Sequence, residues 1–484
     1  MSTSRSAVLT VAVLALCAAL AACGSQLDPE TVAQASGGSG GGAGGAVAGG
    51  TNPDGSVAGG GGATGSTDGS TTGGSTGSSG STGDPASGGG GQQGTGENAA
   101  TGTTKAGSCA GFKNQTGITD KTITIANASD ISGPVPGIFE SAQEATRAYV
   151  AYFNSTSDIC GRKLDVELLD TRADAGADQQ AYTKACDDAF AAVGSMSAFD
   201  SGGASAAQSC GLPDIRSTTT TTERRDCSTC FAAQAVNPGE VNGSMPRYFL
   251  QKYKDATQHA AVIYINAGAA VGNAAAFRNA YNSAGWKVDY FQGIDVSEFN
   301  YAPYVQQMKD KGIKLVTYTG PYQDTVKLLD AMKQQGFEPD AFVQDSTIYD
   351  ANFVDQAGDN GNGVYAWSST KMFDDTSVKE MALYRSWLNQ VKPGAVPNYY
   401  GLYAWSAARL FVEQATALGG KLTRASLVSA LKGVKNWTGN GLHVPQQVGS
   451  KTTSNCGSVL QLDDGKWSQV SPGNFMCGPL LNGN

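Results

Sequence analysis

The sequence predicts an α/β protein built from two doubly wound, Rossmann-like lobes. Short apolar strand patterns alternate with longer amphipathic helix patterns, and the alternation occurs in two separate series. Strands that alternate with helices form βαβ units and parallel sheets. A third observation confines the fold to the C-terminal part of the chain, because residues 24–107 hold 30 of the 65 glycines and no aromatic side chain. Such a segment buries too little apolar surface to offset its chain entropy, so we expect it to be a disordered linker.

The first series lies between residues 122 and 217. We expect strands at 122–126, 164–169 and 212–217, and helices at 140–154 and 179–192. The segment 122–126 reads TITIA, and the helix at 140–154 carries Ala, Tyr and Phe on one face. A further strand is expected to end near residue 197, ahead of a Ser- and Gly-containing loop.

The second series follows residue 243 and has the same alternation. Its strands are expected at 260–265, 287–291, 314–318, 341–343 and 364–368, with helices at 272–284, 302–311 and 323–335. The run AAVIYI at 260–265 is typical of a buried parallel strand. Three helices, at 379–390, 399–417 and 424–431, come next. The segments 459–462 and 467–470 flank an Asp-Gly pair and predict a hairpin.

The first 23 residues predict export. Arg5 precedes an apolar run that ends in Leu-Ala-Ala-Cys23, the pattern of a bacterial lipobox. We therefore expect a lipoprotein signal peptide at 1–22, acylation of Cys23 and a lipid-anchored linker at 23–107; a plain secretory signal is the alternative. With a reach of ~50 Å at ~5–6 Å × √n, the linker would suit a thick, Gram-positive cell wall.

The charge balance excludes some classes of function. The chain has 33 Lys plus Arg against 42 Asp plus Glu, a formal charge of −9, which argues against a nucleic-acid surface. Matches to nucleophile and dinucleotide motifs fall only in the Gly-rich linker, and no nucleophile–base pair is evident. The acids Asp170, Asp174 and Asp178 are interpreted as solvated charge at a helix start. We expect no catalytic residue, no metal and no cofactor.

Eight cysteines remain after Cys17 and Cys23 are set aside, and an even number in an exported chain predicts disulfides. Sequence does not fix their pairing, but nearness suggests Cys227–Cys230 and Cys456–Cys477. A redox role for Cys227–Cys230 is the alternative to a structural one, although the segment lies outside a thioredoxin-like strand–helix pattern.

The loops that follow strands carry hydroxyls, aromatic rings and a carboxylate. They include Ser129–Pro134, Ser197–Gly203, Ser217–Thr222, Tyr318–Tyr322 and Gln344–Ser346. Ligands of open α/β sheets bind outside the carboxyl ends of the strands. This residue set suits the binding of a small polar ligand better than its chemical conversion.

Five segments in collinear order resemble the type I periplasmic-binding-protein superfamily. They are the lipobox, ITDKTITIANASDISGPVPGIFESAQEATRAYVAYFN, GRKLDVELLDTRAD, GLPDIRSTT and VTYTGPYQDTVKLLDAMKQQGFEP. The most similar branch is the branched-chain amino-acid (Leu/Ile/Val) receptor of ABC importers, and the similarity runs from about residue 119 to 470. It implies two lobes joined by three hinge crossovers, which close on a ligand.

The resemblance also implies a ligand site. Tyr322 would cover the ligand, and Asp345 would receive its ammonium group. The carboxylate would meet Thr218, Thr219 and Thr220. The serine of the family pattern falls at Phe199, so that Phe199, Asp200 and Ser201 share this part of the site. The loop after 260–265 has no aromatic residue where the family has a tyrosine.

These expectations define an organisation and a function. The N-terminal lobe would comprise 108–243 and 368–445, and the C-terminal lobe 244–367 and 446–484. The protein would be an extracytoplasmic receptor, not an enzyme, that captures a small ligand, most simply an amino acid, for an ABC permease in the membrane. The alternatives are a sensor of the same fold for amides or aromatic acids, and an anchored hydrolase.

Overall fold

The computed structural model describes residues 105–484, which belong to one compact unit. The expected signal peptide, acylated Cys23 and most of the linker lie outside the described residues. Within the described part of the chain, none of the helices combines the length and the apolar character needed to cross a membrane.

The N-terminal sheet has five parallel strands in the order β2-β1-β3-β4-β5. They are β1 (Thr122–Ser129), β2 (Lys163–Asp170), β3 (Ala191–Val193), β4 (Asp214–Thr218) and β5 (Cys230–Gln234). In β1, Ile123 and Ile125 face one side of the sheet while Ala126 and Ala128 pack on the other. This alternation lets helices cover both faces.

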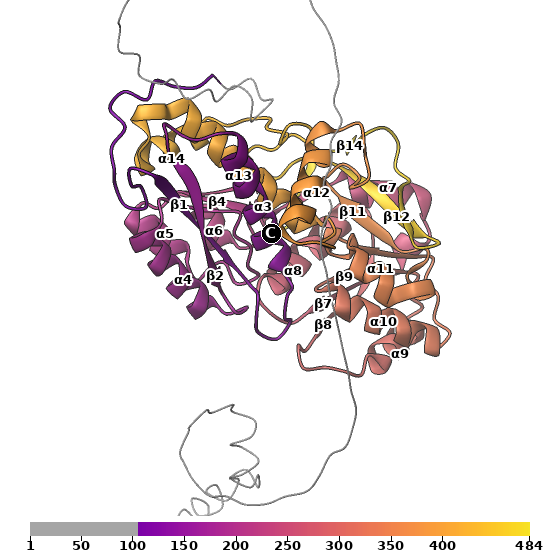
Figure 1. The fold of residues 1–484 in the computed structure, drawn as a ribbon. Helices are drawn as coiled ribbons and strands as arrows, with labels where there is room; N and C mark the ends of the chain where they lie inside the picture. Colours follow the sequence, from indigo (N-terminus) through magenta and orange to yellow (C-terminus); the bar gives the residue numbers. More distant parts are fainter. Residues whose placement is uncertain (1–104) are drawn as a thin grey trace, which may run out of the picture. The chain divides into compact units, whose positions relative to one another are not determined.

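Helices from both ends of the chain cover this sheet. They are α3 (Glu140–Thr156), α4 (Ala175–Asp188), α5 (Ala204–Cys210), α6 (Thr222–Asp226), α12 (Lys379–Val391), α13 (Tyr399–Leu418) and α14 (Arg424–Lys432). In Figure 1, the orange to gold α13 and α14 lie with the indigo and purple strands of the N-terminal sheet. Helix α13 packs on α3 and β4, and most of its residues are buried.

The C-terminal sheet has the order β13-β12-β11-β10-β9-β7-β8. Its parallel strands are β7 (Ala260–Ile265), β8 (Val288–Ile294), β9 (Leu315–Thr319), β10 (Ala341–Gln344) and β11 (Tyr365–Ser368). The antiparallel strands are β12 (Cys456–Asp463) and β13 (Lys466–Gln469), with β14 (Met476–Cys477) beside β12. The expected hairpin is therefore confirmed, and Asp464 and Gly465 supply its turn with positive φ angles of 47° and 70°.

Helices also cover both faces of the C-terminal sheet. They are α7 (Ser244–Lys252), α8 (Ala269–Ser283), α9 (Ala302–Asp310), α10 (Tyr322–Gln334) and α11 (Ala351–Ala357). In β7, Ala260 and Val262 pack with α7 and α8, whereas Ala261 and Ile263 pack with α9, α10 and α11. A two-stranded sheet of β6 (Glu240–Asn242) and β15 (Leu480–Asn482) adjoins them.

The chain crosses between the two sheets three times, as the resemblance implies. It leaves the N-terminal sheet after β5, returns after β11 to form α12–α14, and crosses again after α14 to form β12. The α/β fold with two doubly wound lobes is thus confirmed.

Two elements of the first series differ from expectation. The helix expected at 179–192 ends at Asp188, because residues 191–193 form β3 between β1 and β4. Strand β5 was not expected at all. Both strands are short and contain several alanines, which carry a weak strand signal in the sequence.

The eight cysteines form four disulfides. Cys227–Cys230 and Cys456–Cys477 pair as their nearness suggests, and Cys109–Cys160 and Cys186–Cys210 complete the set.

Candidate functional site

Two adjoining cavities lie at the carboxyl ends of the parallel strands. The first, here the hinge chamber, has a volume of about 220 Å³ and includes Gln234 and Asn242, which flank the first crossover. The second, the apolar chamber, has a volume of about 240 Å³ and is lined mainly by carbon, with Ile138, Phe139 and Ile265 in its wall. Both are lined by residues of the two lobes. They share six lining residues, which are Met196, Thr220, Asn273, Thr319, Asp345 and Tyr400.

Five of the eight expected binding residues line this cleft. Thr218 and Thr219 line the hinge chamber, Phe199 lines the apolar chamber, and Thr220 and Asp345 lie where the two chambers meet. Because β4 and β10 both end at the cleft, the residues that follow them are brought together across the two lobes.

Asp345 is a partly buried carboxylate without a partner cation among the described residues. It follows β10 and caps a short 3-10 helix (Ser346–Ile348), where its side chain accepts a hydrogen bond of 2.9 Å from the Thr347 backbone amide. Burial raises the pKa of Asp345, and the hydrogen bonds from Thr347 act against that shift. An uncompensated carboxylate in a cavity is a favourable site for a positively charged ligand group.

Asp200 does not reach the cleft. It is fully buried and accepts hydrogen bonds from the Thr220 amide at 3.0 Å and the Thr221 hydroxyl at 2.6 Å. The guanidinium of Arg216 lies 3.5 Å away. Asp200 therefore holds the loop after β4 in place from a position outside the two chambers. Its carboxylate is already fully engaged within the protein.

Ser201 and Tyr322 also line neither chamber. Tyr322 begins α10 and packs against the apolar core of the C-terminal lobe, where burial raises its pKa. The ring near Asp345 is that of Tyr400, whose hydroxyl lies 3.1 Å from the Thr347 hydroxyl. Tyr400 lines both chambers, whereas Tyr322, to which the resemblance assigns a covering position, lines neither.

A buried ionic cluster supports the Asp200 loop. Arg224 contacts Asp178 at 2.8 Å and Asp214 at 3.0 Å, and Arg216 lies 3.7 Å from Asp214. All four side chains are fully buried. Burial raises the pKa of Asp178 and of Asp214, and the two arginines act against that shift. The interpretation of Asp178 as a solvated charge is therefore wrong, because its partner Arg224 comes from a helix 46 residues away.

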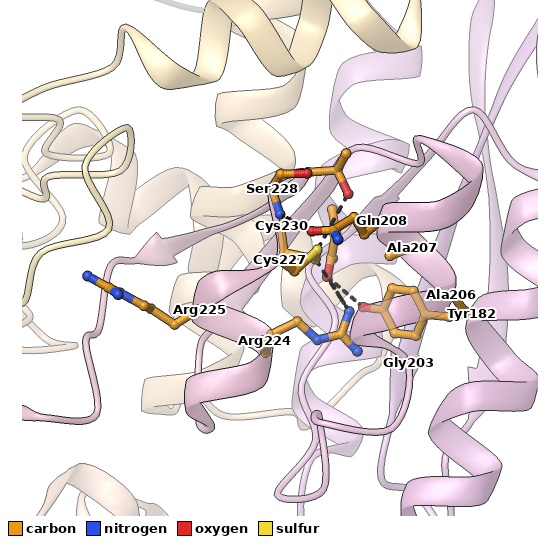
Figure 2. Close-up of a disulfide and its surroundings, with 12 residues drawn as sticks. Tyr182, Gly203, Ala206, Ala207, Gln208, Arg224, Arg225, Cys227, Ser228 and Cys230 are labelled. Atoms are coloured by element: carbon orange, nitrogen blue, oxygen red, sulfur yellow. Dashed lines mark hydrogen bonds and ion pairs between the residues drawn. A yellow bond between two sulfur atoms is a disulfide. The ribbon is translucent and has the colours of Figure 1, made fainter.

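The Cys227–Cys230 disulfide lies against this cluster. Figure 2 shows the Arg224 side chain directed toward Tyr182 and the disulfide, while Arg225 of the same short helix points away. An Arg224 Nη1 atom is 3.8 Å from the Cys230 sulfur, and both cysteines are buried. This burial favours a structural role over redox exchange, which requires an accessible sulfur.

Four tyrosines line the hinge chamber, and only Tyr318 lies in a loop that the sequence analysis singled out. Tyr399 and Tyr400 come from the first turn of α13, Tyr281 from α8 and Tyr318 from β9. Burial raises the pKa of all four, so that they are neutral at ordinary pH. One sequence feature could have indicated two of these tyrosines. Tyr399 and Tyr400 directly follow Asn398, which caps an otherwise apolar helix.

Direct contacts join the lobes at the mouth of the cleft. The Ala269 amide donates to the Ala198 carbonyl at 2.9 Å, and the Asn398 side chain donates to Asp350 at 3.1 Å. Gly268 lies so close to Ala198 that an added Cβ would come within 2.7 Å of the carbonyl oxygen. With the Thr347–Tyr400 contact, these bonds hold the two lobes around the chambers.

The side chains that line the chambers are mainly hydroxyls, amides, carboxylates and apolar groups. Neither of the two histidines lines them, and His443 is buried between the Val444 carbonyl and the Ser406 hydroxyl. No group of three or more His, Cys, Asp or Glu side chains in residues 105–484 could hold a metal ion. The arrangement can surround a ligand and hold it.

Two α/β lobes that enclose a polar and apolar cleft define a two-lobed solute-binding protein. The sequence matches a family model described as periplasmic binding protein over residues 122–466, and the chain belongs to this family. No curated protein matches the sequence.

Solved structures share the fold. A branched-chain amino acid transporter substrate binding protein from Streptococcus pneumoniae, in complex with isoleucine, is 17% identical with a TM-score of 0.61; the match covers 73% of this chain and all of that one. A fatty acid ABC transporter substrate-binding protein from Thermomonospora curvata is 15% identical with a TM-score of 0.65, covering 76% and 95% of the two chains. A solute binding protein from R. palustris, in complex with 4-hydroxybenzoate, is 16% identical with a TM-score of 0.62, covering 74% and 97%.

Proposed function

We propose that this protein is an extracytoplasmic receptor that captures a small solute bearing an ammonium group, most simply an amino acid, and delivers it to an ABC permease. The proposal rests chiefly on Asp345. Its carboxylate lies where the two chambers meet and has no cation of residues 105–484 beside it. An ammonium group at this point would gain a charge-assisted hydrogen bond in a partly desolvated site.

The remaining walls suit the rest of such a solute. Thr218 and Thr219 offer hydroxyls on the side of the N-terminal lobe, and Phe199 and Tyr400 offer rings. The contacts at the mouth of the cleft, Ala269 to Ala198 and Thr347 to Tyr400, join the lobes over this space. Closure on a solute would give the permease a composite surface that neither lobe presents alone.

The binding role is tested by calorimetric titration of the full chain, freed of co-purified ligand, with a panel of amino acids, amides and aromatic acids. We expect an amine-bearing solute to bind, and Asp345→Asn to weaken its binding at least 30-fold, because removing one partner of a buried charge pair costs about 2–5 kcal/mol. Asp355→Asn is the matched control, since Asp355 is exposed on α11 and lines neither chamber. Silence across this whole panel and across simple alkyl- and arylalkylammonium solutes would contradict the receptor role.

The proposal also includes a tether to the outer face of the cell membrane. Acylation of Cys23 followed by a long Gly-rich linker would hold the receptor near its permease while leaving it free to search. We expect Cys23→Ser to move the protein from the membrane fraction to the medium, as measured by immunoblotting of both. Equal membrane retention of the variant would contradict the lipid anchor.

A further inference from the structure

The cleft has a strongly one-sided charge. Among the described residues, no lysine, arginine or histidine lines either chamber, whereas Asp130, Glu240 and Asp345 do. The two acids of the apolar chamber, Asp130 and Asp345, have no ion pair with a cation of residues 105–484. A solute with a net negative charge would meet only carboxylates and neutral groups, so the walls favour a cation.

Three backbone amides beside the cleft are already occupied. The Ala198 amide donates to Asp130 at 2.8 Å, the Phe199 amide to the Ser197 hydroxyl at 3.0 Å, and the Thr220 amide to Asp200 at 3.0 Å. The Thr220 hydroxyl donates to the Ser197 carbonyl. These three amides in the loops after β3 and β4 are thus satisfied by the protein itself, and one of the acceptors, Asp130, is a carboxylate without an ion pair among residues 105–484, which would repel a ligand carboxylate.

The apolar chamber offers space for hydrocarbon next to Asp345. Ile138, Phe139, Phe199 and Ile265 line it, and Phe139 packs edge to face on Tyr400 with ring centroids 4.9 Å apart. Aromatic rings beside a carboxylate favour an organic cation, since ring faces attract positive charge. Either chamber alone is smaller than the ~300–1,000 Å³ of a typical ligand site, while the two together fall within that range.

We propose that the solute is a hydrophobic organic cation, an alkyl- or arylalkylammonium whose nitrogen lies at Asp345 and whose apolar part fills the apolar chamber, and that recognition requires no carboxylate. This inference rests on the proposed receptor function and narrows its ligand from amino acids in general to apolar amines. On the side of the N-terminal lobe, where a carboxylate would be expected, the Ala198 and Thr220 amides are instead bonded to Asp130 and Asp200.

Three matched probes test the inference on the full chain. L-Phenylalanine, 2-phenylethylammonium and 3-phenylpropanoate share a phenyl ring on a two-carbon spacer and differ in which charged groups they carry. We expect 2-phenylethylammonium to bind at least as tightly as phenylalanine in calorimetric titration, and 3-phenylpropanoate to bind more than 30-fold more weakly than either.

An alkylammonium series tests the apolar chamber separately. From butylammonium to octylammonium, affinity is expected to rise up to about fourfold for each methylene that becomes buried. Phe199→Ala should weaken octylammonium about tenfold and butylammonium far less. Phe299→Ala is the control, because Phe299 is 88% exposed and lines neither chamber, and it should change neither affinity.

The outcomes separate this inference from the receptor function. If phenylalanine binds more than tenfold more tightly than 2-phenylethylammonium, a carboxylate is required; the inference then fails while the amino-acid receptor stands. If 3-phenylpropanoate binds most tightly, both the inference and the role of Asp345 are wrong, but the protein is still a receptor. If no ammonium probe binds, the inference is overturned, and silence of the amino-acid and amide panel as well would overturn the receptor function.

Discussion

Both lobes carry buried or partly buried aspartates near the strands of their sheets, but the surroundings of these aspartates differ. In the N-terminal lobe, Asp200 and Asp214 are fully buried and engaged by Arg216, Arg224 and the amide and hydroxyl groups of the loop after β4. In the C-terminal lobe, Asp345 is only partly buried and receives hydrogen bonds from its own turn alone. The same residue type is therefore engaged by ion pairs in one lobe, whereas in the other Asp345 lines the cleft without an ion pair among residues 105–484. The difference arises because the tertiary structure places an arginine beside Asp200 and beside Asp214, but places no cation of the described residues beside Asp345.

The largest expected effect on stability comes from removing Arg224, a cation of the buried ionic cluster in the N-terminal lobe. Arg224→Met should lower the free energy of unfolding by about 3–5 kcal/mol, because Asp178 and Asp214 would remain buried without their shared partner. Urea unfolding followed by tryptophan fluorescence measures this. Arg225→Met is the control, since Arg225 points away from the cluster and pairs only with Asp226 at the surface, and it should change stability by less than about 0.5 kcal/mol. If both substitutions lowered the free energy of unfolding equally, the buried ion pairs of Arg224 would contribute no more to stability than the surface pair of Arg225.

A pair of identical substitutions compares the two lobes directly. Asp200→Asn should lower the free energy of unfolding by about 1.5–3 kcal/mol, because a charged acceptor of the Thr220 amide and Thr221 hydroxyl is lost. Asp345→Asn keeps its one local bond, since an asparagine side chain can also accept from the Thr347 amide, and stability should stay within about 0.5 kcal/mol. The expected ranking in urea unfolding is thus opposite to the ranking for ligand affinity. A large loss of stability in Asp345→Asn would instead make Asp345 a structural residue.

The parts of this picture that sequence could predict are those with local signals. The strand patterns at 122–126 and 260–265 and the Asp-Gly turn of the β12–β13 hairpin depend on near neighbours, and all three are present. The rule that ligands lie beyond the carboxyl ends of strands placed Thr218–Thr220 and Asp345 correctly at the cleft.

The remaining residues depend on distant partners. Asp200 could not be told from Asp345 without knowing that Arg216 lies behind it, and Asp178 looked solvated because Arg224 is far away in the chain. Tyr400 reaches the cleft from a helix that follows the second crossover, so no pattern near β9 could reveal that it, and not Tyr322, lines the cleft.

The smallest expected effect is a pH dependence that belongs to Asp345 alone. Burial raises the pKa of this carboxyl, so its proton is held more tightly than in water, and an ammonium ligand must displace it. Affinity for 2-phenylethylammonium should be constant near neutral pH and fall, by up to about tenfold per pH unit, once the pH drops below that raised pKa. The tyrosines around Asp345 are neutral throughout this range, because burial raises the pKa of each. Asp130 also lines the apolar chamber and its pKa is raised by burial, so the assignment needs a variant. In Asp345→Asn the remaining weak affinity should be flat with pH. If the acid-side slope persists there, another acid of the cleft is the titrating group, and the charge that attracts the ligand is not that of Asp345.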